Sequence, residues 1–228
     1  SPLRPDFFRA LTDNDRGYLN FAPALAGIHP LYQWKRTTNM TVASSVKAAS
    51  TPSGVVVFVK WKAPFVAGVS TRYLFSPAGE VTVKHTAAGL FLPMLKVGMR
   101  VGIKSTLENV EWYGRGPQET YCDRKTGAKI ARHSSTVAKL EHRYMRPQEY
   151  GHRTDTRSLE ITDAAGSGIV IDAMDIPFGF NLGYYTPEKL DRAKHLFELE
   201  KDNCITLCLD AAERGVGGDM PGCAYLHK

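Results

Sequence analysis

The sequence predicts an all-β fold built from antiparallel sheets, and two observations carry this prediction. Most of its apolar runs alternate with polar residues, which is the two-residue period of a strand with one buried face. Turn-forming clusters, such as residues 52–54 (PSG) and 77–79 (PAG), separate many of these runs. Short strands joined by tight turns are typical of a β-sandwich or a β-barrel.

The predicted strands are short and rich in β-branched or aromatic residues. In chain order they are residues 55–61, 69–75, 80–86, 95–103, 158–163, 168–174 and 204–210. One amphipathic helix is predicted over residues 186–200, with Thr186 as its N-cap and Pro187 at its first helical position. We expect it to cover a sheet. Residues 14–33 and 143–156 fit no period and are predicted as long loops, where binding residues usually lie.

Composition and length indicate one large globular domain over residues 1–228. The net charge is +6, but the basic residues are spread along the chain, so we expect neither nucleic acid nor a membrane as a partner. No apolar run reaches the ~18 residues of a transmembrane helix. The four cysteines form no CxxC pair, and Cys204 and Cys208 would lie about 13 Å apart along one strand. Reduced thiols and a cytoplasmic location are expected, without a metal site.

Two Pro-Gln-Glu triplets end at Glu119 and Glu149, and each follows an arginine by a few residues. A glycosidase needs two carboxyl groups about 5 to 9.5 Å apart, which these could supply if their loops converged. The alternative is that each glutamate accepts hydrogen bonds from loop backbone or pairs with an arginine. We favour this alternative, because paired loop carboxylates are commoner than catalytic ones.

Three other features suggest sites. His152 lies in a polar loop beside Glu149 and Asp155, where a sugar epimerase or mutarotase would hold an acid or base. Residues 12–17 (TDNDRG) could bind a cation through oxygen atoms, but more often form an Asx-turn network at a loop mouth. Residues 215–222 (GVGGDMPG) predict a tight turn with close backbone approach. Serine-hydrolase and nucleotide-binding motifs are absent from the sequence.

Five segments in order carry a resemblance to a known family. They are RALTDNDRG (9–17), WYGRGPQETYCDR (112–124), RPQEYGHRTDTR (146–157), AKHLFEL (193–199) and LDAAERGVGGD (209–219). Together they resemble the C-terminal module of bacterial glycoside hydrolase family 2 β-galactosidases, which is a separate small chain in two-subunit members. The resemblance covers nearly the whole chain.

The resemblance implies a large antiparallel supersandwich like that of galactose mutarotases, truncated here at both ends. It places the catalytic carboxylates in a separate TIM barrel, so no catalytic residue is expected in this chain. The implied role is to complete the active-site wall and stabilise the assembly. Implied partners are the remaining domains or large subunit and a galactoside; exposed sheet edges would favour pairing with a second copy. No cofactor is expected in this chain, whereas Mg and Na belong to the full enzyme.

The resemblance also implies which residues contact substrate. The mobile loop after DNDRG closes near the sugar in the family, with its hinge at Gly17 here and its far end before Trp34. The expected substrate-binding residues are Asp13, Asn14, Asp15, Gly17, Trp34, His152, Gly218 and Asp219. Gly222 stands where many members have a tryptophan that stacks on the aglycone, so lactose is not assumed as substrate. The alternative interpretation is a stand-alone sugar-binding or mutarotase-like protein.

Overall fold

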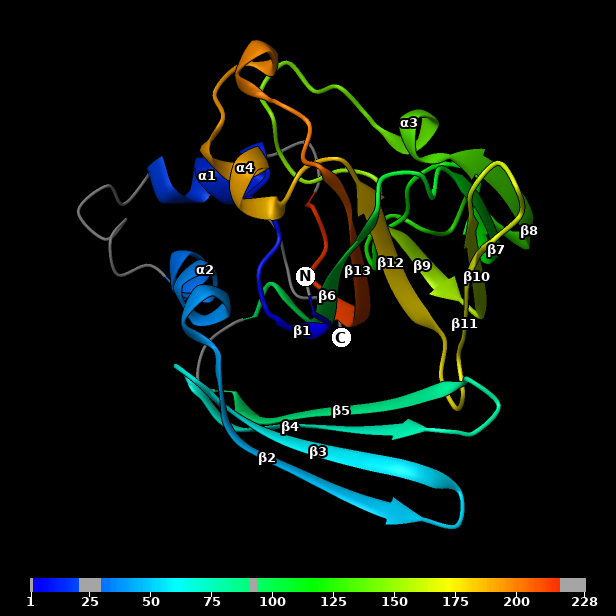
Figure 1. The fold of residues 1–228 in the computed structure, drawn as a ribbon. Helices are drawn as coiled ribbons and strands as arrows, with labels where there is room; N and C mark the ends of the chain where they lie inside the picture. The colour runs from blue at the N-terminus through cyan, green and yellow to red at the C-terminus, as the bar shows by residue number, and fades with distance from the viewer. Residues whose placement is uncertain (1, 21–29, 91–93, 218–228) are drawn as a thin grey trace. The chain divides into compact units, whose positions relative to one another are not determined.

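The computed structural model describes residues 2–20, 30–90 and 94–217, and within them the fold is mostly β (Figure 1). Every strand pairing in its three sheets is antiparallel. The predicted all-β class is therefore confirmed. The contacts divide the chain into two compact units, residues 30–94 and residues 1–29 with 95–228. The prediction of one supersandwich domain stays a prediction.

The smaller unit is a helix followed by a four-stranded meander. Helix α2 (Pro30–Met40) leads into strands paired in chain order: β2 (Val42–Thr51), β3 (Gly54–Ala63), β4 (Val66–Phe75) and β5 (Val81–Leu90). The predicted turn at residues 52–54 joins β2 to β3. Gly54 adopts a φ of 125°, and a Cβ there would lie 2.0 Å from the Phe75 carbonyl oxygen, so only glycine fits. Strand β2 was not predicted, because its short polar residues lack an apolar alternation.

The larger unit contains the other two sheets. The five-stranded sheet has the order β1 (Arg4–Asp6), β6 (Lys96–Lys104), β13 (Cys204–Glu213), β12 (Phe178–Gly183) and β9 (Arg153–Thr156). The four-stranded sheet has the order β11 (Gly168–Asp172), β10 (Ser158–Thr162), β7 (Asn109–Gly116) and β8 (Lys129–Thr136). The first sheet brings together strands from both ends of the chain, which the sequence pattern did not specify.

One hydrophobic core joins these two sheets. Leu159 and Ile161 of β10 and Ile205 and Leu207 of β13 are at most 1% exposed and belong to the same cluster. Trp112 of β7 meets Phe180 of β12 edge to face, with ring centroids 5.8 Å apart. The alternating burial along β7 and β10 follows the predicted two-residue period. Two sheets that share one core form a sandwich within this unit.

The helices differ from the prediction. Thr186 does cap helix α4 (Pro187–Arg192), accepting a hydrogen bond from the Lys189 backbone N–H. The single helix over residues 186–200 is wrong, however, because Ala193 is extended and only a 3₁₀ turn, η2 (Leu196–Glu198), follows. Leu196 and Phe197 are 36% and 84% exposed, so these two residues of the apolar stripe do not pack on the core and do not sustain a helix.

The loop predicted over residues 14–33 is wrong for its described residues. Helix α1 (Asp13–Asn20) and the start of α2 occupy them, and residues 21–29 lie outside the described part. Thr12 and Asp15 cap α1 reciprocally: the Asp15 N–H donates to Thr12 Oγ1 and the Thr12 N–H to Asp15 Oδ2. This T-x-x-D pattern was the available sequence signal. A short helix, α3 (Val137–Leu140), follows β8. Among the described residues, no helix is long and apolar enough to cross a membrane.

Candidate functional site

Three of the sequence motifs meet in the larger unit. The Asp13 backbone N–H donates to Gln148 Oε1 at 3.0 Å, and Gln148 Nε2 donates to Asp13 Oδ2 at 2.9 Å. Asn14 Nδ2 donates to the Val216 carbonyl at 2.9 Å. The start of α1 is therefore attached both to the second Pro-Gln-Glu segment and to the segment after β13. These contacts span more than 130 residues of sequence.

A fourth motif, residues 112–124, holds the segment after β13 through the side chain of Asp123. Its carboxylate accepts the backbone N–H groups of Val216 at 3.2 Å and Gly217 at 2.8 Å. A Cβ at Gly215 would lie 2.2 Å from Asp123 Oδ2, and Gly217 has a φ of 83°. The predicted close backbone approach is confirmed for residues 215–217, and it explains why glycine occupies both positions.

Beneath these segments lies a buried ionic cluster, formed by Asp6, Arg9, Asp15, Lys96, Arg100, His152, Asp210 and Glu213. Lys96 Nζ lies 2.9 Å from Asp6 Oδ2 and 3.2 Å from Asp210 Oδ1, and its side chain is 2% exposed. Strand register explains the arrangement: Gly98 of β6 lies between Asp6 of β1 and Asp210 of β13. A Cβ at Gly98 would lie 2.0 Å from Asp210 Oδ1, so glycine leaves room for the carboxylate.

Arg9 connects the cluster to the convergent motifs. Its Nη1 lies 2.8 Å from Asp15 Oδ2, its Nε lies 3.5 Å from Glu213 Oε1, and its Nη2 donates to the Gly215 carbonyl. Burial opposes the ionised form of Asp15, but the Arg9 charge together with hydrogen bonds from Arg9 and Thr12 outweighs burial and lowers the pKa of that carboxyl. One guanidinium thus joins the cap of α1 to the end of β13.

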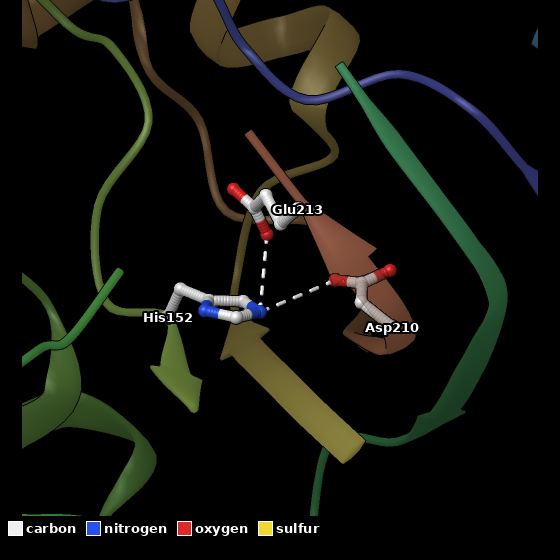
Figure 2. A group of neighbouring side chains, drawn as sticks. All are labelled: His152, Asp210 and Glu213. Atoms are coloured by element: carbon white, nitrogen blue, oxygen red, sulfur yellow. Dashed lines mark ion pairs between the residues drawn. The ribbon is translucent and has the colours of Figure 1, made fainter. Parts of the chain in front are cut away.

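His152 lies between two carboxylates of this cluster, as Figure 2 shows. Its Nε2 is 3.1 Å from Glu213 Oε2 and 3.6 Å from Asp210 Oδ2, and its Nδ1 donates to the Thr120 carbonyl at 3.2 Å. The ring is 2% exposed and stacks on Tyr121. Burial disfavours the imidazolium, but Glu213 and Asp210 outweigh burial and raise the pKa of His152 to about 9. The histidine is therefore cationic at neutral pH.

The two glutamates of the triplets have different surroundings. Glu119 accepts from Arg124, from Tyr144 Oη at 3.1 Å and from the Gly151 N–H at 2.8 Å. This confirms the prediction for Glu119. Glu149 instead accepts from the side-chain amide of Asn181, so the arginine or backbone partner predicted for it was wrong.

Glu149 is 5% exposed and has an unusual pKa. Burial, assisted by the nearby Glu213 carboxylate, raises the pKa of Glu149 to about 8. Glu149 is therefore mostly protonated at neutral pH. The buried acidic groups Asp6, Asp15, Asp210 and Glu213 face Arg9, Lys96, Arg100 and the His152 imidazolium, and Arg100 pairs in addition with the partly exposed Glu188. Opposite charge beside each group is what allows ionised side chains to stay buried.

His152, Asp210 and Glu213 each offer one ligand atom, all within 4.8 Å of one another. Their surroundings do not fit a metal ion. Lys96 and Arg9 already supply opposite charge to the two carboxylates, and His152 holds a proton where a metal would need a lone pair. The Mg and Na expected of the full enzyme would need oxygen ligands that retain water, which a buried cluster of this kind lacks.

The predicted substrate-binding residues are distributed as follows. Asp13, Asn14 and Asp15 lie in the first turn of α1, and Gly17 lies within the same helix. Trp34 is fully buried on α2 in the smaller unit, and His152 is buried in the cluster. Gly218, Asp219 and Gly222 lie outside the described residues. Substrate contact stays a prediction for all of them.

Sequence reasoning missed the other members of the cluster. Lys96 and Arg100 lie on the same face of β6. Asp6 and Asp210 lie on the two strands that flank β6, and both are opposite Gly98. In the sequence they look like polar positions of half-exposed strands. A signal was present in β13, where Asp210 interrupts an otherwise apolar run. The basic partner of Asp210, Lys96, becomes evident only from the pairing of β6 with β13.

Comparisons with known proteins identify the family. The family model described as beta galactosidase small chain matches residues 1–228. A β-galactosidase of Priestia megaterium is 31% identical over 231 residues, covering 100% of this chain and 22% of the relative. The β-galactosidase BgaC of Bifidobacterium adolescentis is 33% identical over 235 residues, covering 97% of this chain and 21% of the relative. The chain thus spans about a fifth of the curated relatives it matches. It belongs to the β-galactosidase small-chain family.

Proposed function

We propose that this chain is a non-catalytic module that completes the active-site wall of a β-galactosidase. The observation that carries the proposal is the attachment of α1, residues 148–152 and residues 215–217 to one buried ionic cluster. A family-2 β-galactosidase hydrolyses terminal β-D-galactosides with carboxylates of its barrel domain. In this proposal the present chain holds two wall segments in fixed positions beside that barrel.

The proposed role depends on the conformational order of the wall segments and not on a chemical step. A wall segment that binds substrate must lose little conformational freedom on binding, because ordering a residue costs about 1–2 kcal/mol. Arg9, Asp123 and Gln148 fix the segments in advance through partners in the chain's own interior. In the sequence, residues 215–217 are followed by Gly218 and Asp219, where the family resemblance expects substrate contacts. Helix α1 is followed by residues 21–29, which belong to the loop that closes near the sugar in the family.

The carboxylates also favour a non-catalytic role. Glu119 already accepts from three donors, and Glu149 is enclosed and mostly protonated. Glu119 lines a cleft, but its oxygens already have these partners, and Glu149 is 5% exposed. No observation favours the alternative of a mutarotase-like protein, since the His152 ring is 2% exposed and would have to reach a sugar. In our proposal His152 is a positioning residue.

The remaining assignments follow from the same proposal. The partners are the other domains or the large subunit, with a galactoside as substrate of the assembly and Mg and Na held by the other domains. A second copy of the chain stays a predicted partner. A cytoplasmic location is in keeping with Cys122, Cys204 and Cys208, which are free thiols.

The test is to measure hydrolysis of a chromogenic β-galactoside by the 228-residue chain, by the polypeptide with the remaining domains, and by both together. We expect activity only when both are present. Asp123→Ala should lower kcat/KM of the assembly, whereas Lys104→Gln, an exposed substitution at the end of β6, should not. Substantial hydrolysis by the 228-residue chain alone would overturn the proposal.

A further inference from the structure

A second feature of the larger unit is a cleft that shares Asp123 with the site described above. This cleft of about 960 Å³ is bounded on one side by residues 117–128 and on the other by residues 139–144, at and beyond the end of α3. Trp112, Arg153, Ser134 and Ser135 complete its lining. Figure 1 shows α3 near the ends of β7 and β8. The volume is sufficient for a small molecule of drug size.

The acidic groups that line this cleft already have partners. Glu119 pairs with Arg124, Glu141 pairs with Arg143 at 3.0 Å, and Asp123 accepts two backbone N–H groups. Lys125, which also lines the cleft, pairs with Asp155 at 3.2 Å. The carboxylates of the cleft are therefore committed to neighbours.

Two cations of the lining remain without an acidic partner among the described residues. Arg153 is 5% exposed, yet no carboxylate there lies within ion-pair distance of it. Its guanidinium donates to the carbonyls of Gly151 and Pro117 and lies over the Trp112 ring, while its Nε has no acceptor. Lys139 is exposed on α3 and likewise forms no ion pair within the described part of the chain.

A buried guanidinium without a counter-charge is costly, since desolvation is offset only by neutral carbonyl acceptors. The pKa of Arg153 reflects this: burial lowers it to about 10, although Tyr121 and Glu119 act in the opposite direction. An anion in the cleft would supply the missing charge. Arginine and lysine together with hydroxyl groups are the groups that bind oxyanions in proteins. The hydroxyl of Ser134 lines the cleft, whereas those of Ser135 and Tyr144 already donate to the Thr136 carbonyl and to Glu119.

We propose that this cleft binds a small phosphate-bearing molecule, with Arg153 and Lys139 supplying the positive charge and the Ser134 hydroxyl a further hydrogen bond. The phosphate could belong to a free phosphate ion or to a sugar phosphate. A neutral sugar would leave both cations uncompensated, which is why we favour the anion. No group of the ionic cluster takes part, and of the residues that hold the wall segments only Asp123 also lines this cleft.

The experiment is a titration of the 228-residue chain, labelled with ¹⁵N, with inorganic phosphate, with glucose 6-phosphate and with glucose. Ionic strength is held constant with NaCl. We expect saturable amide shifts at residues that line the cleft, such as Gly127, Ser135 and Lys139, with both phosphates and not with glucose. Tighter binding of the sugar phosphate would identify it as the preferred source, and equal affinity would identify the free ion.

The variants test the charges. Lys139→Gln should weaken phosphate binding about fivefold or more, as expected for loss of one charged contact. Lys104→Gln removes an exposed lysine that does not line the cleft and should leave the affinity unchanged. Absence of saturable shifts in the folded wild-type chain, equal shifts with glucose, or an unchanged affinity in Lys139→Gln would overturn the proposal. Because the readout is binding, its failure leaves the hydrolysis test unaffected.

Discussion

Replacing Lys96 by methionine tests the buried ionic cluster most directly. Methionine keeps most of the volume of the lysine stem, so the change removes the charge without opening a large cavity. Lys96 Nζ lies 2.9 Å from Asp6 and 3.2 Å from Asp210, and all three side chains are at most 2% exposed. The variant would leave two buried carboxylates with less opposite charge.

The expected loss in the free energy of unfolding is about 3–5 kcal/mol, the usual cost of removing one partner from a buried ion pair. Arg100 Nε, 3.8 Å from Asp6 Oδ2, compensates one carboxylate in part and keeps the loss within this range. For a chain of this size the loss corresponds to a fall in Tm of roughly 6–20 °C.

The loss in the free energy of unfolding caused by Lys96→Met should depend on pH. Burial opposes ionisation of Asp6, but Lys96 and Arg100 outweigh it and lower its pKa below 3.8. A carboxyl with a lowered pKa contributes stability above its unfolded pKa and loses it as pH falls through the folded value. Removing Lys96 reduces that contribution. The difference in the free energy of unfolding between wild type and variant should therefore become smaller as pH falls below 3.8.

Urea denaturation followed by circular dichroism, at neutral pH and at several pH values below 3.8, measures both effects. The matched control is Lys104→Met on the same strand, where the lysine is exposed and the expected change is within about 0.5 kcal/mol. Adding Asp210→Asn to Lys96→Met should restore part of the stability, because it removes one uncompensated charge. A loss below about 1 kcal/mol, or one equal to that of the control, would refute the reasoning.

Three further changes test neighbouring features. The pKa of His152 is raised from 6.5 to about 9, so the histidine should contribute about 3 kcal/mol to the free energy of unfolding below pH 6.5. This contribution should disappear as pH rises through 9. In urea denaturation, the free energy of unfolding of His152→Gln should therefore depend less on pH than that of the wild type. Gly179→Ala places a Cβ 2.4 Å from the His152 ring and should cost about 1–3 kcal/mol in thermal unfolding, whereas Gly127→Ala, with open space around it, should be neutral; equal effects would contradict this. Asp123→Ala removes two hydrogen bonds from residues 215–217 and should cost about 1–3 kcal/mol in urea; a change within error would show that the segment is held otherwise.

Local pattern was sufficient for several elements. The alternation in residues 55–61, 158–163 and 204–210 predicted strands that the structure contains, since a half-buried strand requires that period. The cap at Thr186 was also readable, because its hydroxyl accepts a hydrogen bond from a residue only three positions away. The extent of the helix was not, since that depended on whether Leu196 and Phe197 found a surface to pack against.

The sequence by itself determined the strand periods, the glycine turns and the set of motifs that mark the family. Only the tertiary structure decided what those motifs do together. Whether His152 faces solvent or two carboxylates depends on the pairing of β9 with β12 and of β12 with β13, which brings the start of β9 beside the end of β13. Charge balance in a buried cluster is a property of three-dimensional neighbours, and no local period in the chain encodes it.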